Sequence, residues 1–333
     1  MTAIQVSGPY FEDLRVGYVE RRAPAITLTE GHAALHQAIL GGRLRLALDA
    51  PLAYRVLGAE RPLAHPALVC DTAIGQSTLL TQRVIANLFY RGLRLHRAPL
   101  IGDTLHTATE VVALKQNRPR PDRAATGLAV LRIHTVDQQE RLVLDFTRCA
   151  MLPLRDPAAV TGHADDIHAG TPDLDPALLA EAIAGWDLAP LRSQGPAFAD
   201  FREGTTWEID GGDVVSSAPE LARLTTNVAL AHHDRAAGQG GRRLVYGGHT
   251  IGLAAAQLTR ALPDLAFILA WHSCDHLAPV FEDDVLTSTV HLEQRTPLSD
   301  SGGLLHLRSQ VSARRADGTS ADVLDWRLIA AHA

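Results

Sequence analysis

Residues 10–17 read Tyr10-Phe11-Glu12-Asp13-Leu14-Arg15-Val16-Gly17, and residues 197–204 repeat the pattern as Ala197-Phe198-Ala199-Asp200-Phe201-Arg202-Glu203-Gly204. A second pair of matching segments, Ala98 to Leu105 and Ala278 to Val285, is separated by 180 residues. The halves also close alike, with Val143-Leu144-Asp145-Phe146 in one and Val323-Leu324-Asp325-Trp326 in the other. A chain that repeats its segments in the same order is predicted to contain two copies of one fold.

The repeat predicts the domain boundaries in this chain of 333 residues. Residues 1–154 are expected to form an N-terminal domain and residues 197–333 a C-terminal domain. Between them, residues 155–196 contain five prolines and several aspartates, a composition typical of a linker rather than of a packed sheet. Asp175 is suited to cap one short helix in this linker, with Pro176 at its first position.

Each half shows the same order of elements, with helical segments first and strands after them. The strands are predicted from alternation, as in residues 285–292, and from the Asp317-Gly318 turn between the last two strands. Helices followed by an antiparallel meander indicate an α+β fold. The helical segments expected from composition and spacing are Glu30–Leu40, Pro66–Leu80, Pro219–His232 and His249–Leu262.

The composition is that of an ordinary globular protein, with 46% hydrophobic and 20% charged residues. The net charge of -6 is spread over mixed acidic and basic residues, which argues against binding to nucleic acid or to a membrane surface. No uncharged apolar run approaches the ~20 residues needed to cross a bilayer. Three cysteines without metal-ligand spacing fit a reducing compartment. We therefore expect a cytoplasmic protein.

Only the second copy contains a segment suited to chemistry. It reads Asn227-Val228-Ala229-Leu230-Ala231-His232 and is followed by Tyr246-Gly247-Gly248-His249, whereas the first copy has no histidine between His36 and His65. An imidazole has an unperturbed pKa of ~6.5 and can accept or donate a proton near neutral pH. His232 is therefore the candidate acid–base group. The alternative is a structural histidine, which is the commoner case, and Asn227 could equally cap a turn.

These segments together resemble the MaoC-like acyl-CoA hydratases and dehydratases in their fused, double hot-dog form. Within that family, the order and position of Ile85-Ala86-Asn87-Leu88, Leu114-Lys115-Gln116-Asn117 and the run from Gly241 to His249 are most similar to the mesaconyl-CoA hydratases (β-methylmalyl-CoA dehydratases). The resemblance implies a tandem hot-dog fold, in which each half is an antiparallel sheet wrapped around a central helix. The two halves should then pack as a pseudo-twofold pair.

The resemblance also implies a reaction, the addition or removal of water at the α,β bond of a short, branched dicarboxylic acyl-CoA. In the family an Asp five residues ahead of the His completes the catalytic pair, but this chain has Asn227 there. An amide cannot take up a proton, although its oxygen can orient a water molecule. The backbone N–H of Gly247 or Gly248 could stabilise the enolate oxygen, because the start of a helix favours negative charge. The two glycines could also serve only as a tight entry to the helix.

Arg243 is the first candidate for the distal carboxylate of the substrate, together with Arg242, because guanidinium groups bind carboxylates in a bidentate manner. Equally, the two arginines could be a solvated pair on a loop. Tyr246 and His249 are further candidates for substrate binding. Asp234 and His276 are additional candidates for the site, Asp234 because it could share the acid–base role with His232.

No cofactor is expected, because the sequence lacks metal-ligand spacing, a dinucleotide-binding fingerprint and a nucleophile elbow. The expected partner is an acyl-CoA substrate, and a homodimer is compatible with the sequence. Two other functions stay open at this point. One is a hot-dog thioesterase, or a dehydratase acting on another acyl-CoA or carrier-bound chain, since these enzymes share the fold. The other is a non-catalytic acyl-thioester binding protein, because Asn227 weakens the expected acid–base pair.

Overall fold

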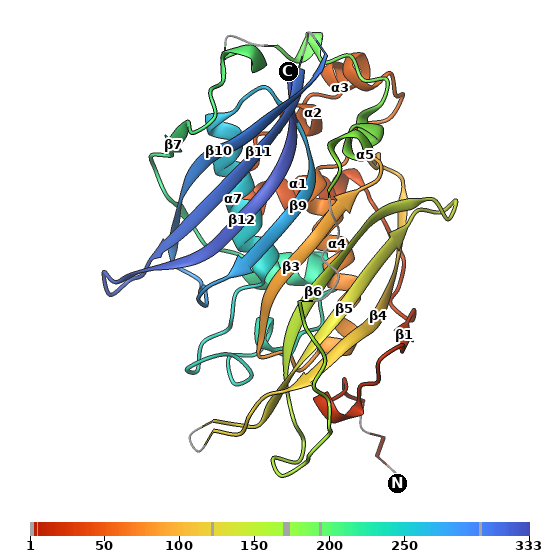
Figure 1. Ribbon diagram of the computed structural model, residues 1–333, viewed down its shortest axis with the longest axis vertical. Helices are drawn as coiled ribbons and strands as arrows, with labels where there is room; N and C mark the ends of the chain where they lie inside the picture. The colour runs from red at the N-terminus through yellow and green to blue at the C-terminus, as the bar shows by residue number, and fades with distance from the viewer. Residues whose placement is uncertain (1–2, 5, 121–122, 169–173, 193–194, 300–301) are drawn as a thin grey trace.

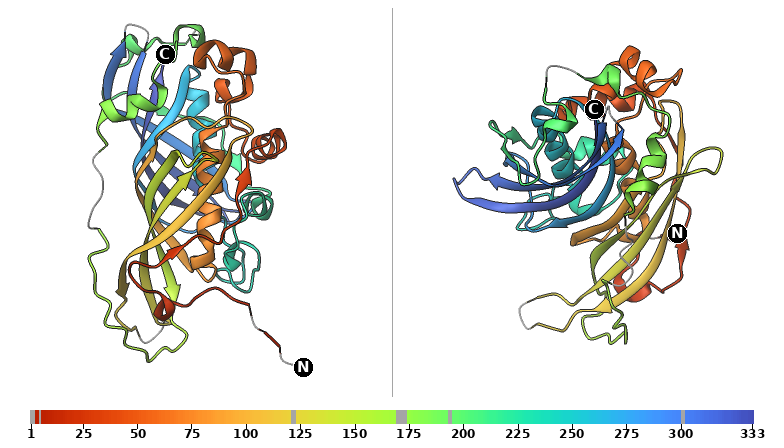
Figure 2. Two further views of the ribbon diagram at one scale, coloured as in Figure 1. Left: turned by 90° about the vertical axis from the view of Figure 1, so that its right-hand side faces the viewer. Right: turned by 45° about the horizontal axis from the view of Figure 1, so that its top comes forward.

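The computed structural model describes residues 1–333 except 1–2, 5, 121–122, 169–173, 193–194 and 300–301. The described residues form one antiparallel sheet of twelve strands, and the helices other than the short linker helix α5 (Pro176–Ala180) gather on one face of it (Figure 1 and Figure 2). The strands are β1 (Val19–Glu20), β2 (Ile26–Thr27), β3 (Ala86–Leu95), β4 (Thr104–Gln116), β5 (Thr126–Val136), β6 (Leu142–Pro153), β7 (Thr206–Glu208), β8 (Asp213–Val214), β9 (Leu265–His276), β10 (Val285–Ser299), β11 (Gly302–Arg314) and β12 (Ser320–His332).

The order of the strands reveals the internal symmetry. Along the sheet it runs β1-β4-β5-β6-β3-β9-β12-β11-β10-β7, so that β3 meets β9 in the middle and corresponding strands follow outward on both sides. The central pair is antiparallel, with Tyr90 opposite Cys274. This arrangement confirms the predicted α+β double hot-dog fold and the pseudo-twofold packing of its halves. The single sheet also means that the halves share one edge rather than merely touching.

The helices are α1 (Glu30–Leu40), α2 (Arg45–Leu48), α3 (Ala50–Leu57), α4 (Pro66–Gln76), α5 (Pro176–Ala180), α6 (Ala218–Leu224) and α7 (Gly247–Ala261). The central helices of the two halves are α4 and α7, and they pack against each other behind the sheet (Figure 1). Burial on nearly all sides explains why both are apolar around almost their whole circumference. The expected helices at 30–40, 66–80 and 249–262 are thereby confirmed to within a few residues.

The expected helix over 219–232 is wrong in its second part. Helix α6 ends at Leu224, and only a short 3₁₀ turn, Leu230–His232, follows. Thr226 adopts a positive φ of 56°, and the Asn227 side chain accepts a hydrogen bond from the N–H of Ala229. Asn and Thr side chains compete in this way with the helical pattern of backbone hydrogen bonds. The interruption turns the chain toward the site described below.

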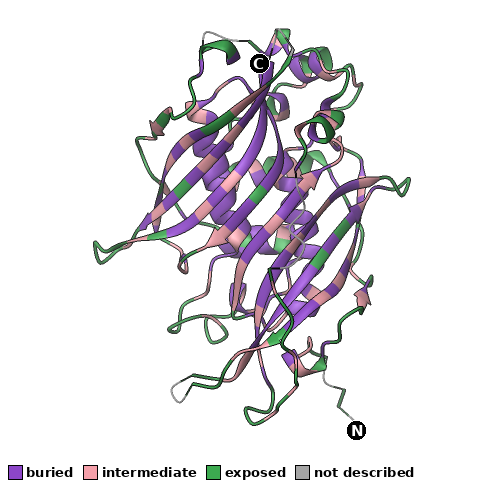
Figure 3. Cartoon of the chain, viewed as in Figure 1, coloured by how far each residue is buried: buried purple, intermediate pink, exposed green. Residues whose placement is uncertain are grey.

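The hydrophobic core runs continuously through both halves, as the buried positions along the strands indicate (Figure 3). Tyr90 of β3 packs edge-on against Trp271 of β9 with ring centroids 5.7 Å apart, and Trp271 does the same against Trp326 of β12 at 5.5 Å. Edge-to-face aromatic pairs of this kind add to the stabilisation from burial alone. The row of rings therefore ties the two halves together.

Residues 155–196 contribute no strand in the part that the structure describes, and they return along the outer face of the sheet (Figure 1 and Figure 2). Helix α5 begins at Pro176, and the Asp175 carboxylate accepts a hydrogen bond from the N–H of Ala177 at 2.9 Å. The predicted cap and short helix are thus confirmed. The boundaries at 154 and 197 stay predictions. Among the described helices, none combines the length and apolarity needed to span a membrane.

Candidate active site

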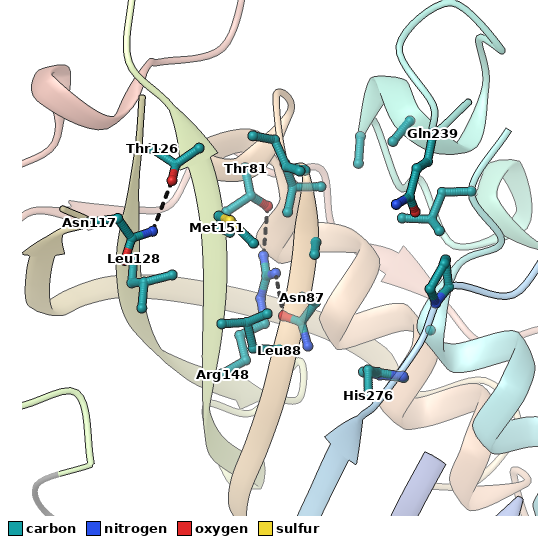
Figure 4. A pocket seen from close by; sticks show the side chains of 18 of the residues that line it. Thr81, Asn87, Leu88, Asn117, Thr126, Leu128, Arg148, Met151, Gln239 and His276 are labelled. Carbon is teal, nitrogen blue, oxygen red and sulfur yellow. Dashed lines mark hydrogen bonds between the residues drawn. The ribbon is translucent and has the colours of Figure 1, made fainter. Parts of the chain in front are cut away.

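A cavity of about 1240 Å³ lies between the two halves. Both halves contribute to its wall (Figure 4). The first half contributes residues of β3, of β6 and of the loop after β4. The second half contributes residues of the 3₁₀ turn before α7, of the start of α7 and of the end of β9. This volume suits a ligand larger than a typical drug molecule. The wall includes the polar or aromatic residues Thr81, Asn87, Tyr90, Arg148, Asn227, His232, Tyr246 and His276.

His232 is held in one tautomer. Its side chain is 9% exposed and lines the cavity, and its Nδ1 lies 2.8 Å from the carbonyl oxygen of Leu244. Because a carbonyl only accepts, Nδ1 carries the proton of the neutral ring and Nε2 is left as the basic nitrogen. Burial lowers the pKa of His232 to about 4, and the positive charge of Arg148 acts in the same direction. The ring is therefore a neutral base near pH 7.

The segment that carries His232 is docked on the first half of the chain. The N–H of Val228 donates to Oγ1 of Thr78 at 2.9 Å, and the N–H of Leu230 donates to the carbonyl of Gln82 at 2.8 Å. Gly75 of α4 permits the approach, because a Cβ at that position would collide with the backbone oxygen of Thr225. The second half thus supplies the histidine, and the first half fixes the backbone that presents it.

Asn227 closes a turn and also lines the cavity. Its Oδ1 accepts from the N–H of Ala229 at 2.9 Å, which closes a tight turn, and its backbone oxygen accepts from Nε2 of His233 at 2.6 Å. The same buried side chain also lines the cavity. An amide oxygen has two lone pairs, so capping the turn leaves Oδ1 able to accept a second hydrogen bond.

A buried network behind the cavity holds Tyr246 in place. The hydroxyl of Tyr246 donates to Oδ1 of Asp71 at 3.1 Å, and Nε2 of His36 lies 3.1 Å from the other oxygen of that carboxylate. The ring of Tyr246 packs edge-on against His232 with centroids 5.7 Å apart. Gly248 makes room for this network, because a Cβ there would collide with the Asp71 carboxylate. The network connects α4 of the first half to α7 of the second half through side chains.

Gly247 and His276 face each other in the wall of the cavity. A Cβ on Gly247 would lie 2.7 Å from Nε2 of His276, so only glycine fits without moving the ring. Gly247 is the first residue of α7, and the first N–H groups of a helix have no partner within the helix. Burial lowers the pKa of His276 to about 4, and its Nε2 makes no hydrogen bond to the described residues.

The remaining sequence candidates lie outside the wall of the cavity. Arg242 stacks on the ring of Phe281, with its guanidinium carbon 4.0 Å from the centroid. Arg243 forms an ion pair with Glu282 at 2.6 Å. Asp234 is exposed and caps a turn through Ala236. His249 is completely buried behind the cavity, and Gly248 borders the Asp71 network instead of the cavity itself.

Two cavity residues of the first half, Asn87 and Arg148, were not among the predicted site residues. Arg148 did carry a signal in the sequence, because strand alternation from Phe146 places it on the core side of β6. The corresponding position in the second copy, 180 residues later, is the buried Leu328. A charged residue at a core position in only one of two repeats marks a functional candidate. In the described part of the chain, no group of three or more His, Cys, Asp or Glu side chains is placed to hold a metal ion.

We expect the free energy of unfolding to fall already between pH 6.5 and 5, where most carboxylates are still ionised. Burial lowers the pKa of His65 to about 3 and the pKa values of His232, His249 and His276 to about 4. Between pH 6.5 and 5 the unfolded chain therefore binds protons that the folded chain does not, and the free energy of unfolding falls as the pH falls. Each of these histidines contributes up to about 1.4 kcal/mol per pH unit in this range.

Urea unfolding at pH 7.5, 6 and 5 measures the effect. His65→Gln removes one of the four groups and should flatten the dependence, whereas replacing the exposed His272 in the same way should leave the slope unchanged. An unfolding free energy that does not fall between pH 6.5 and 5 would contradict the assignment of neutral rings to these four histidines.

Comparison with known proteins places the chain among enzymes of one kind. It is 31% identical over 295 residues to the beta-methylmalyl-CoA dehydratase of Chloroflexus aurantiacus, which covers 86% of this chain and 82% of that protein. It is 29% identical over 310 residues to the mesaconyl-CoA hydratase of Cereibacter sphaeroides, with 91% and 88% covered. No family model matches the chain.

Two solved structures agree with the fold along nearly the whole chain. A conserved protein of Mycobacterium tuberculosis, described as having a double hotdog fold, matches with a TM-score of 0.88 and 53% identity over 98% of this chain and 99% of that one. A Chloroflexus aurantiacus protein, described as a MaoC domain protein dehydratase, matches with a TM-score of 0.85 and 28% identity over 99% of both chains. With curated relatives aligned over most of its length and this fold in place, the chain belongs to the MaoC-like double hot-dog family of acyl-CoA hydratases and dehydratases, which are hydro-lyases.

Proposed function

We propose that the chain adds water to, and removes it from, the α,β bond of a short, branched dicarboxylic acyl-CoA of the mesaconyl-CoA and β-methylmalyl-CoA type. The observation that carries the proposal is the neutral His232, fixed by the Leu244 carbonyl and placed in the wall of a large cavity between the halves. The names of the two curated relatives support the substrate class.

In the hydration direction, the oxygen of a water molecule bonds to the β-carbon while one of its protons passes to Nε2 of His232. The electrons of the double bond move to the α-carbon and the thioester carbonyl, which becomes an enolate. Its oxygen can be stabilised by the N–H of Gly247 at the positive end of α7. The proton on His232 then passes to the α-carbon, so that one water is added and the base is restored.

A thioesterase or a binding protein of the same fold would need the same cavity, so a direct assay has to separate them. The protein is incubated with mesaconyl-CoA, and the enoyl absorbance and the free thiol are followed together. Loss of absorbance without thiol release is expected. Thiol release would mean hydrolysis, and an unchanged solution with measurable binding would mean a non-catalytic protein; either result overturns the proposal.

The edge of the cavity offers a site for the phosphates of CoA. Arg118, Arg120 and Arg123 belong to the loop after β4, are exposed and line the cavity, with the exposed Lys115 just before them. The CoA nucleotide carries several negative charges, and guanidinium groups bind phosphate well.

Replacing Arg118, Arg120 and Arg123 together by serine should raise KM for acyl-CoA about tenfold and weaken its dependence on salt, with kcat little changed. A triple variant of Arg15, Arg21 and Arg55, which are exposed but lie outside the cavity wall, is the matched control. Steady-state kinetics at two ionic strengths measure both effects. Equal behaviour of the two triple variants would refute a phosphate site on this loop.

A further inference from the structure

Arg148 is a buried cation that forms no ion pair with any carboxylate of the described residues. Its side chain, on β6, is 3% exposed and lines the cavity. Among the described residues, its guanidinium donates only to uncharged oxygens. They are Oγ1 of Thr81 at 2.8 Å and Oδ1 of Asn87 at 3.3 Å (Figure 4), and the carbonyl of Ser77 at 3.2 Å. A charge removed from water without an opposite charge is costly, and an arginine cannot escape the cost by losing its proton.

The unpaired polar atoms of Arg148 and its neighbour Asn87 are hydrogen-bond donors without an acceptor. Nε of Arg148 and Nδ2 of its neighbour Asn87 are both buried, and neither has a partner among the described residues. Both atoms are donors. A hydrogen bond joins the two residues in the cavity wall, so one positive charge and two unpaired donors belong to one cluster. Such a cluster suits an anion with more than one oxygen, as a carboxylate has.

The fold itself does not require this charge. Leu328 takes the corresponding position of β12 in the second copy, where it is buried in the core. Because the same strand accommodates an apolar side chain in one half, the arginine in the other half calls for a functional explanation.

We propose that Arg148, assisted by Asn87, binds the distal carboxylate of the acyl group and so selects dicarboxylic over monocarboxylic enoyl-CoA substrates. The inference rests on the proposed function, and it moves the carboxylate site from Arg243, which is paired with Glu282 outside the cavity wall, to the opposite half of the chain. In mesaconyl-CoA the carboxylate is attached to the β-carbon. Its receptor must therefore share a cavity with the base that activates water, as Arg148 and His232 do.

A pair of substrates isolates the contribution of the carboxylate. Tiglyl-CoA has the same double bond and methyl branch as mesaconyl-CoA, with a methyl group where mesaconyl-CoA has the carboxylate. Arg148→Gln should lower kcat/KM for mesaconyl-CoA about 30-fold relative to that for tiglyl-CoA, since hydrogen bonds to a charged group are involved. Equal losses for both substrates would leave the ratio unchanged and show that Arg148 is only a structural anchor. Unchanged kcat/KM values for both substrates would show that Arg148 does not contact the acyl group.

Two further variants separate a loss of carboxylate binding from a general loss of folding. Asn87→Asp places a carboxylate beside Arg148 without changing the volume, and the internal ion pair should exclude the carboxylate of the substrate and lower the same ratio. Arg91→Gln, on the neighbouring strand, removes a partly buried arginine that pairs with Asp275 outside the cavity wall. It should leave the ratio unchanged; a fall as large as that of Arg148→Gln would overturn the assignment.

A binding measurement separates this inference from the proposed function. Methylsuccinyl-CoA and 2-methylbutyryl-CoA are saturated, cannot be hydrated and differ only in the carboxylate. By calorimetry, the wild-type protein should bind the former more tightly, and Arg148→Gln should remove the preference. A preference that disappears in the variant supports the carboxylate site even if the wild-type protein hydrates nothing. A wild-type protein without any preference overturns the site even if hydration is observed.

Discussion

Replacing His232 by alanine is expected to lower the turnover of mesaconyl-CoA about 10²- to 10⁴-fold, the usual consequence of removing a positioned general base. The binding of acyl-CoA should persist, because the ring supplies one edge of a large cavity. Steady-state kinetics measure the loss, and calorimetry with methylsuccinyl-CoA measures the binding. His272→Ala is the control, since His272 is exposed and outside the cavity wall. Near-normal turnover in His232→Ala would eliminate the mechanism.

The pH dependence of the wild-type enzyme offers a second readout for the same residue. Burial lowers the pKa of His232 to about 4. The ring therefore stays unprotonated at pH values well below 6.5, the ordinary pKa of histidine. We therefore expect kcat/KM to stay level from pH 7 down to about 5 and to fall only as the pH approaches 4. An acidic limb near pH 6.5 would mean that the ring is solvated in the working enzyme.

Replacing Asn227 by alanine should lower turnover about 10²-fold. We infer two losses: Oδ1 can no longer orient the attacking water, and without the hydrogen bond from the N–H of Ala229 the segment that leads to His232 is held less firmly. Asn227→Asp keeps the volume and the acceptor oxygen and restores the residue type expected from the family. This variant should retain the turn and a substantial part of the activity.

The comparison of the two Asn227 variants distinguishes the roles of the side chain. Amide exchange of the Ala229 N–H reports the turn, and initial rates report the chemistry. If neither substitution changes the rate, Asn227 is only a turn residue, and His276 becomes the first candidate for a partner of His232. Asp234, an earlier candidate, is exposed and caps a turn through Ala236 outside the cavity wall.

The repeat predicted the fold well because the signals were local and occurred twice. The central helices, the strand alternation around residues 285–292 and the turn at Asp317-Gly318 all depend on short-range patterns, and each has a counterpart in the other half. The helix expected over 219–232 was wrong because the positive φ of Thr226 and the capping side chain of Asn227 break a segment whose composition otherwise favours a helix.

The site was harder to predict, because it is built from both halves. Spacing within the second copy was enough to select Asn227, His232 and Gly247, which the structure brings to one cavity. Spacing could not reveal that β3 pairs with β9 and so brings Arg148 of the first half into the same cavity. The prediction that only the second copy carries chemistry stays a prediction for the base, and the proposed carboxylate receptor belongs to the first copy.

The adjacency of Arg242 and Arg243 gave a misleading impression of a carboxylate site. Their side chains have partners that the sequence does not place beside them, the ring of Phe281 and the carboxylate of Glu282. An arginine that already pairs with a carboxylate has less to gain from a second one. Arg148 shows the opposite case, a buried arginine whose partners among the described residues are all uncharged.

The most direct test of the central claim, hydration of an enoyl-CoA by His232, is mass spectrometry of the products formed from mesaconyl-CoA in water enriched in oxygen-18. The wild-type protein should yield an intact CoA thioester that carries one heavy oxygen as a hydroxyl group, and His232→Ala should yield almost none. Heavy oxygen found instead in a free carboxylic acid with released CoA, or a labelled thioester formed equally well by His232→Ala, would contradict the account.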